Sequence, residues 1–181
     1  MSVTGPFAVV GPSGVGKDTV MEAVRAADPT VVLVRRVITR PAEAGGEAFD
    51  GVDRSTFETM KAEGLFALDW EAHGLAYGIP ASIHDDLNAG RPVLFNGSRA
   101  MLSEAARVFP GLRVLSITAQ DNVLASRLRA RGRETEAEIA QRLERARLPL
   151  PSGLRVTVID NSGALDHAVD AVRAALQPVR A

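Results

Sequence analysis

A glycine-rich stretch near the start of the chain constrains the fold more than any other feature. The sequence Gly11-Pro12-Ser13-Gly14-Val15-Gly16-Lys17-Asp18 follows the apolar run Phe7–Val10 and precedes a helical pattern from Thr19 to Ala27. Glycines let a backbone curl round a phosphate chain with its N–H groups inward, and the following helix adds the positive end of its dipole. A strand, a loop and a helix in this order predict a phosphate-binding loop.

Lys17 strengthens this interpretation. The chain has only two lysines, Lys17 and Lys61, among 21 basic residues, so a sequence that otherwise uses arginine has placed a lysine where such a loop needs one. Its ammonium would reach the β- and γ-phosphates as a compact charge. The alternative is a glycine-rich turn that binds nothing. We expect the loop to bind a triphosphate through Gly11, Pro12, Ser13, Gly14, Val15, Gly16, Lys17, Asp18 and Thr19.

Asp18 departs from the usual form of this loop, in which a Ser or Thr hydroxyl at that position binds Mg²⁺. A carboxylate is also a good ligand for Mg²⁺, directly or through water. The competing interpretation is that Asp18 only favours the first turn of its helix by its charge. Asn96 ends a predicted strand where many such proteins place a metal-supporting acid, and an amide supplies no charge. Asp18 is therefore the predicted metal residue.

Composition narrows the class of protein. A chain of 181 residues predicts one domain, residues 1–181, and a net charge of −1 gives no bulk attraction to nucleic acid or to an anionic membrane. Cysteine is absent, which excludes disulfides and thiolate metal sites, and the three histidines are scattered. No apolar run reaches the length of a membrane span, and the N-terminus lacks a secretion signal pattern. We expect a cytoplasmic protein with no nucleic-acid or membrane partner.

Short apolar strands alternate with amphipathic helices, which predicts an α/β fold with a five-stranded parallel core sheet flanked by helices. The predicted strands are Phe7–Val10, Val31–Val37, Pro92–Asn96, Arg113–Thr118 and Arg155–Asp160. The predicted helices are Lys17–Ala27, Thr56–Glu63, Ala81–Ala89, Ser98–Val108, Asn122–Arg131, Glu136–Arg147 and Leu165–Leu176. Capping boxes are predicted at Ser55 with Glu58 and at Thr135 with Glu138.

Two regions interrupt this alternation. Residues Thr39–Ile79 are rich in Gly, Asp and Glu, with a possible hairpin around Phe66–Trp70 and Leu75–Tyr77. Residues Arg127–Arg147 hold seven arginines, which could form a solvated helix face paired with nearby glutamates. Both regions should lie above the carboxyl edge of the sheet, where open α/β sheets bind ligands.

Over nearly its whole length the chain resembles the guanylate-kinase branch of P-loop kinases. The resemblance rests on the glycine-rich loop, Ile38-Thr39-Arg40-Pro41, Gly46-Glu47, His73-Gly74 with Tyr77-Gly78, and the arginine-rich run from Arg127 to Leu143. It implies a P-loop kinase fold with an acceptor-binding insertion at about residues 39–79 and an arginine-rich lid at about residues 131–136.

Within that branch the chain is more similar to the ribose 1,5-bisphosphate phosphokinases. Further matches are Gly16-Lys17-Asp18, Phe66-Ala67-Leu68-Asp69-Trp70, Asn96-Gly97-Ser98-Arg99 and Ile159-Asp160-Asn161-Ser162-Gly163. This resemblance implies transfer of the γ-phosphoryl group of ATP, with Mg²⁺, to the 1-phosphate of ribose 1,5-bisphosphate. The product would be 5-phosphoribosyl 1-diphosphate, made in phosphonate breakdown.

Differences from the guanylate-kinase sequence pattern also favour the ribose 1,5-bisphosphate phosphokinases. Leu68 stands where that enzyme reads guanine with a Glu, and Ile79 replaces a hydroxyl residue. A pocket that hydrogen-bonds a base discriminates through those groups, so their loss argues against guanine. A second phosphate-binding arginine two residues after Arg40 is also missing, because Ala42 is there. Arg36 or Arg54 could replace it.

The resemblance also suggests roles for individual residues. Arg131 and Arg142 are the predicted catalytic lid arginines, Arg40 would bind the acceptor's 5-phosphate, and Asp69 and Tyr77 would contact the acceptor. The alternatives are surface ion pairs for the arginines and Asp69, and simple packing for Tyr77. Two other functions stay open: a guanylate or other nucleoside monophosphate kinase, and a non-catalytic interaction module of guanylate-kinase-like fold.

Overall fold

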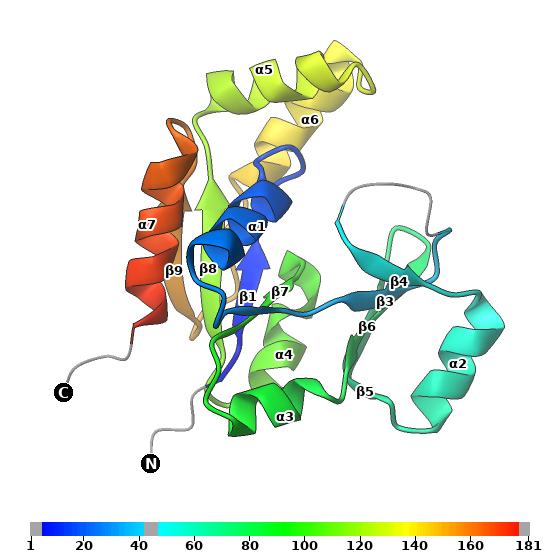
Figure 1. Cartoon of the computed structure of the whole chain (residues 1–181). Coiled ribbons are helices and arrows are strands. Elements are labelled where there is room, and N and C mark those ends of the chain that lie inside the picture. Colours follow the sequence, from blue (N-terminus) through cyan, green and yellow to red (C-terminus); the bar gives the residue numbers. More distant parts are fainter. Residues whose placement is uncertain (1–4, 42–46, 178–181) are drawn as a thin grey trace.

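A five-stranded parallel sheet forms the centre of the molecule (Figure 1). The computed structural model describes residues 5–41 and 47–177. The sheet has the order β2-β7-β1-β8-β9, made of β2 (Val32–Leu33), β7 (Val93–Asn96), β1 (Phe7–Val10), β8 (Arg113–Thr118) and β9 (Arg155–Asp160). Every strand pair in it is parallel. The predicted α/β fold with a five-stranded parallel core sheet flanked by helices is confirmed.

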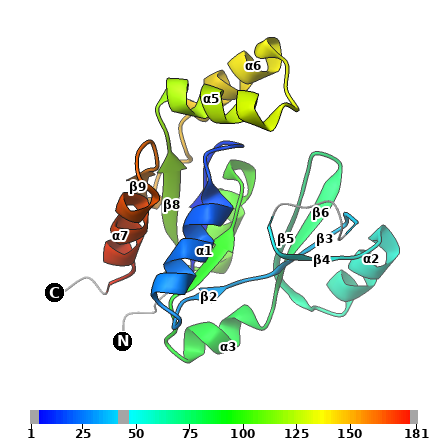
Figure 2. The ribbon, with the colours of Figure 1, turned by 45° about the horizontal axis from the view of Figure 1, so that its top comes forward.

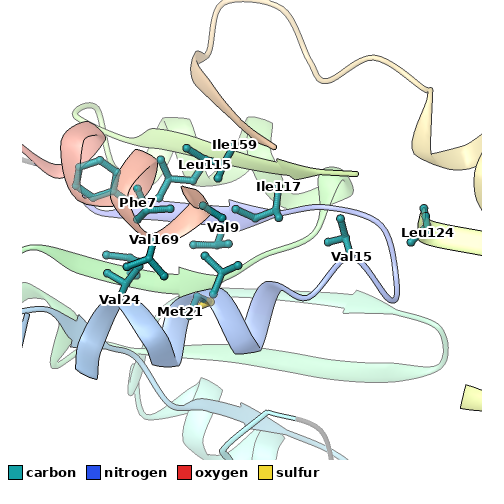
Figure 3. Close-up of a cluster of buried hydrophobic side chains, with 14 of the residues drawn as sticks. Phe7, Val9, Val15, Met21, Val24, Leu115, Ile117, Leu124, Ile159 and Val169 are labelled. Atoms are coloured by element: carbon teal, nitrogen blue, oxygen red, sulfur yellow. The ribbon is translucent and has the colours of Figure 1, made fainter. Parts of the chain in front are cut away.

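Helices cover both faces of this sheet. The helices of the described residues are α1 (Lys17–Ala27), α2 (Arg54–Ala62), α3 (Ile83–Asn88), α4 (Leu102–Val108), α5 (Asp121–Arg131), α6 (Glu136–Ala146) and α7 (Leu165–Leu176), with a 3-10 turn, η2 (Arg99–Met101), before α4. Of these, α1 and α7 pack on one face of the core sheet and α3 and α4 on the other. The fully buried strand β1 alternates its side chains between two apolar clusters. Phe7 and Val9 pack with α1 and α7, as Figure 3 shows, whereas Ala8 and Val10 pack with α3 and α4.

A second, four-stranded sheet lies to one side of the core sheet (Figure 1). Its order is β4-β3-β6-β5, made of β4 (Phe49–Gly51), β3 (Arg36–Ile38), β6 (Leu75–Pro80) and β5 (Phe66–Ala72). The predicted single strand Val31–Val37 is wrong, because β2 stays in the core sheet while β3 begins the second sheet. A continuous apolar run carries no signal of where the chain passes from one sheet to another. The predicted hairpin is present as β5 and β6 and is longer than expected.

Helices α5 and α6 form an arch above the carboxyl edge of the core sheet (Figure 2). Gly132, with φ at 66°, ends α5, and Thr135 then starts α6 with the predicted capping box to Glu138. The other predicted box is wrong: α2 begins at Arg54, and Asp53 caps it by accepting a hydrogen bond from the Thr56 amide. Within the described residues, no helix is long and apolar enough to cross a membrane.

Candidate active site

The glycine-rich loop joins β1 to α1 in the predicted place. Gly14 and Gly16 have φ angles of 85° and 94°, which glycine adopts without strain. Between them Val15 is fully buried and lies beside Leu124 of α5 (Figure 3). A side chain on Gly14 would come within 2.8 Å of Leu128, which is also on α5. The loop therefore needs glycine for its shape and for its close contact with α5.

Lys17 turns back over the loop. Its Nζ donates to the carbonyl oxygens of Gly11 at 2.8 Å and Pro12 at 3.4 Å. Burial lowers the pKa of Lys17, and the nearby Asp18 carboxylate acts in the opposite direction. Arg36 and Arg131 lower this pKa further and Glu47 raises it. Charges from the second sheet and from α5 therefore act on the loop lysine.

A cavity of about 730 Å³ extends from the loop to the second sheet. Among the described residues lining it, the charged side chains are Lys17, Arg36, Arg99, Arg127, Arg131 and the single carboxylate Asp18. Of the predicted site residues, those on this cavity are Gly11, Ser13, Gly14, Gly16, Lys17, Asp18, Thr19, Tyr77 and Arg131, whereas Pro12, Val15, Arg40, Asp69 and Arg142 do not line it. Such an excess of positive charge suits an anionic ligand.

Asp18 and Asn96 lie together on this cavity, although they come from different elements. The Asn96 amide donates to Oδ1 of Asp18 at 2.9 Å, which leaves Oδ2 free of any protein hydrogen bond among the described residues. No group of three or more His, Cys, Asp or Glu side chains able to hold a metal occurs in the described part of the chain. One carboxylate next to a phosphate loop still fits Mg²⁺, which is usually held by one or two carboxylates, water and substrate phosphates.

Two residues outside the predicted site brace the loop. Arg127 donates to the carbonyl oxygens of Val15 at 3.2 Å and Asn161 at 2.8 Å, and the Asn161 amide donates to Val15 at 2.8 Å. Asn161 is 5% exposed, and its Nδ2 lies 2.8 Å from where a Cβ on Gly16 would stand. Both residues also line the cavity. No local sequence pattern predicts the bonds of Arg127 and Asn161 to Val15, because they join positions 112 and 146 residues apart.

The two predicted lid arginines differ in their surroundings. Arg131, at the end of α5, has its Nη1 3.4 Å from the Ser13 hydroxyl of the loop. Arg142, on α6, forms an ion pair with Glu134 at 3.2 Å and lines a second cavity of about 510 Å³. The geometry thus brings Arg131 to the phosphate loop and leaves Arg142 away from the first cavity.

The second sheet presents a planar stack to the first cavity. Trp70 and Tyr77, paired across β5 and β6, have ring centroids 5.3 Å apart, and the Arg36 guanidinium lies 4.9 Å from the Tyr77 centroid. Arg36 is 7% exposed and forms an ion pair with Glu47, its Nε donating to Oε2 at 3.1 Å. Arg36 therefore presents a buried, fixed cation to the ligand.

The remaining predicted acceptor residues lie elsewhere. Arg40 stacks on Phe49, with 4.3 Å from its guanidinium carbon to the ring centroid. Asp69 forms an ion pair with Lys61 at 2.6 Å. Of the two candidates for the missing arginine, Arg36 lines the cavity, while Arg54 pairs with glutamates on the surface. The Ala42 position and Gly46 fall outside the described residues.

Leu68 and Ile79, which stand at the guanine-reading positions, pair across β5 and β6. They are 4% and 0% exposed and pack in the cluster that contains Ala8 and Phe95 of the core sheet. Neither side chain lines the first cavity. At these positions guanylate kinase has a Glu and a hydroxyl residue that read guanine. The second sheet of this protein instead presents the aromatic faces of Trp70 and Tyr77 and the cation of Arg36 to the cavity.

The fold and this site define a P-loop kinase of the guanylate-kinase type. The structure is similar to that of guanylate kinase from Anaplasma phagocytophilum, with a TM-score of 0.71 at 20% identity, covering 97% of this chain and 85% of that one. A gluconokinase from Sinorhizobium meliloti shares the fold more distantly, with a TM-score of 0.55 at 20% identity and coverage of 97% and 93%. No family model matches the chain.

Sequence relatives identify the family more closely. The chain is 51% identical over 176 residues to the ribose 1,5-bisphosphate phosphokinase of Ruegeria sp. strain TM1040, covering 97% of this chain and 93% of that protein. It is 45% identical over 172 residues to the enzyme of that name from Agrobacterium fabrum, with coverage of 93% and 94%. The chain belongs to the ribose 1,5-bisphosphate phosphokinase family, as the sequence resemblance predicted.

Proposed function

We propose that the protein transfers the γ-phosphoryl group of ATP to the 1-phosphate of ribose 1,5-bisphosphate, giving 5-phosphoribosyl 1-diphosphate and ADP. It would act in the cytoplasm, in phosphonate breakdown. The observation that carries this proposal is the first cavity, which joins the phosphate loop to the wall of the second sheet and, among the residues that the structure describes, is lined by five positive side chains and one carboxylate. Membership of the family supports the identity of the acceptor.

Catalysis of this reaction depends on the positioning of the two substrates and on neutralisation of phosphate charge more than on proton transfer. An oxygen of the acceptor phosphate attacks the γ-phosphorus, the bond to the β–γ bridging oxygen breaks, and ADP leaves with that oxygen. The attacking oxygen is already deprotonated near neutral pH, so no general base is required. This fits a cavity in which Asp18, the one carboxylate among the described lining residues, is hydrogen-bonded to Asn96.

Different side chains of the site would have different roles in this reaction. The loop amides and Lys17 hold the triphosphate, and Arg131 neutralises the transferring group from α5. Arg142 would have to move with α6 to reach the transferring phosphoryl group. Arg36 takes the place of the missing acceptor-phosphate arginine, Tyr77 lines the acceptor subsite, and Arg40 and Asp69 remain candidates for the 5-phosphate and the ribose. Residues 39–79 serve as the acceptor-binding insertion, and residues 131–136 as the lid.

Asp18 would hold Mg²⁺, which supplies charge neutralisation on the β- and γ-phosphate oxygens when bound, and Thr19 would help to bind the triphosphate. Asp18→Ala is expected to raise the Mg²⁺ concentration for half-maximal activity by about tenfold, because it removes a charged ligand. Asp166→Ala, which removes a first-turn acid from α7, should leave this value unchanged. If Asp18→Ala changes only the melting temperature, Asp18 serves the helix dipole alone.

Acceptor choice tests the proposal against a nucleotide kinase. We expect kcat/KM for ribose 1,5-bisphosphate to exceed that for GMP by about 10³-fold or more, because this site offers no groups at Leu68 or Ile79 to meet the polar edge of guanine. ADP release measured with a panel of phosphosugars and nucleoside monophosphates gives the ratio. The Lys17→Ala variant, purified in parallel, measures any contaminating kinase. A preference for GMP would replace the proposal, and ATP turnover with any acceptor would exclude a non-catalytic module.

A further inference from the structure

Arg99 lies in the turn that follows β7, beside the phosphate-binding loop. It begins η2, three residues after the end of β7, where the Gly97 amide bonds to the Val9 carbonyl at 2.9 Å and fixes the start of the turn. The turn leaves the carboxyl edge of the core sheet beside β1, the strand that leads into the phosphate loop. The side chain thus starts from a rigid base next to the loop.

The Arg99 side chain borders both cavities. Both cavities are also lined by Gly11 and Ser13 of the phosphate loop and by His73, at the tip of the hairpin between β5 and β6. The second cavity adds Arg142 and Arg145 of α6. Arg99 therefore lies where the loop, the second sheet and α6 come together, which is where a donor and an acceptor phosphate would meet.

The guanidinium of Arg99 is only partly satisfied by the protein. One nitrogen, Nη1, donates to the carbonyl oxygen of Arg145 at 3.1 Å. The buried Nε has no hydrogen-bond partner among the described residues. No carboxylate of the described residues forms a salt bridge with the Arg99 guanidinium. By contrast, Glu47 and Glu134 meet the charges of Arg36 and Arg142. A half-buried cation with unused donors is suited to bind an anion bidentately.

We propose that Arg99 is a further catalytic residue, which binds the reacting phosphate of the acceptor and holds it in line with the γ-phosphorus. This rests on the proposed function only in requiring that the acceptor be a phosphate. The guanidinium of Arg99 would reduce the repulsion between the acceptor phosphate and the γ-phosphoryl group as the new P–O–P bond forms and the bond to ADP breaks. Its remaining hydrogen bond, to Arg145, keeps the guanidinium next to α6.

The competing role for Arg99 is to hold α6 in place through that one hydrogen bond. Guanidinium rescue separates the two roles, because a small cation can refill an anion site but cannot re-attach a helix. The variants are Arg99→Ala and Arg99→Lys, which keeps the charge and the stem without the fork. Arg107→Ala is the matched control, since Arg107 lies on the adjacent helix α4 and pairs with Glu104 at the surface.

We expect Arg99→Ala to lower kcat/KM for ribose 1,5-bisphosphate by about 10²–10³-fold, with the KM for ATP changed less than about threefold. Arg99→Lys should fall between this variant and the wild type. Guanidinium chloride at a non-denaturing concentration should raise the activity of Arg99→Ala by about tenfold or more, and leave the wild type and Arg107→Ala unchanged.

Wild-type-like kcat/KM in Arg99→Ala, or a loss that guanidinium does not relieve, would overturn the proposal. If Arg99→Ala does not fold, Arg99→Lys decides, because full activity there contradicts a bidentate role. If the wild type prefers GMP, the proposed function fails and the same comparison is made with GMP. Equal rates for wild type and Arg99→Ala would then reject Arg99 alone.

Discussion

Lys17→Ala is expected to lower kcat by about 10³-fold or more, because it removes a charge that stabilises the transferring phosphoryl group. The Lys17 ammonium donates to the carbonyl oxygens of Gly11 and Pro12, so it already lies close to where the phosphates would bind. The melting temperature should change little, since these bonds stabilise the loop and not the core. Steady-state kinetics and thermal unfolding measure both quantities.

The other lysine gives the control. Lys61 lies on α2, lines neither cavity and is paired with Asp69, so Lys61→Ala should keep near-normal turnover. Lys17→Arg should be nearly as inactive as Lys17→Ala, because a planar guanidinium does not fit the space of a compact ammonium in this loop. Near-normal turnover in Lys17→Ala would reject the assignment of the loop.

Arg131→Ala should lower kcat by about 10²–10³-fold, because arginines placed against a transferring phosphoryl group contribute on this scale. Arg131 ends α5, reaches the Ser13 hydroxyl and lowers the pKa of Lys17 through its charge. The KM for the acceptor should change less than kcat, since the contact strengthens in the transition state.

Arg129 on the same helix provides a matched control. It is exposed, lines neither cavity and forms an ion pair with Glu136 at 2.7 Å. Arg129→Ala should therefore keep activity within about threefold of the wild type, as expected for an exposed surface pair. Equal losses in the two variants would mean that the arginines act by stabilising the arch of α5 and α6, and not by contact with phosphate.

The phosphate loop could be predicted from sequence because its constraints are local. Gly14 and Gly16 need positive φ angles, and Lys17 and Asp18 follow in fixed order. The core strands β1, β7, β8 and β9 and the helix α1 follow from short-range patterns for the same reason. The predicted start of α2 is wrong, because two residues only two positions apart, Asp53 and Ser55, both suit a helix N-cap and sequence does not choose between them.

The walls of the cavity depend on long-range contacts, which sequence patterns do not reveal. The bond from Asn96 to Asp18 spans 78 positions, and the bond from Asn161 to Val15 spans 146. The stack of Arg36 on Tyr77 depends on β3 pairing with β6 in one register. The family resemblance predicts acceptor contacts for Arg40 and Asp69, whereas their contacts with Phe49 and Lys61 form only in the folded second sheet.

The most direct test of the central claim is the phosphorus NMR spectrum of the wild-type protein with ATP, Mg²⁺ and ribose 1,5-bisphosphate. The account predicts that ADP forms together with a new pair of coupled doublets, from a diphosphate on the sugar, while the 5-phosphate signal persists. A spectrum in which the bisphosphate is unchanged, while GMP under the same conditions is converted to GDP, would contradict it.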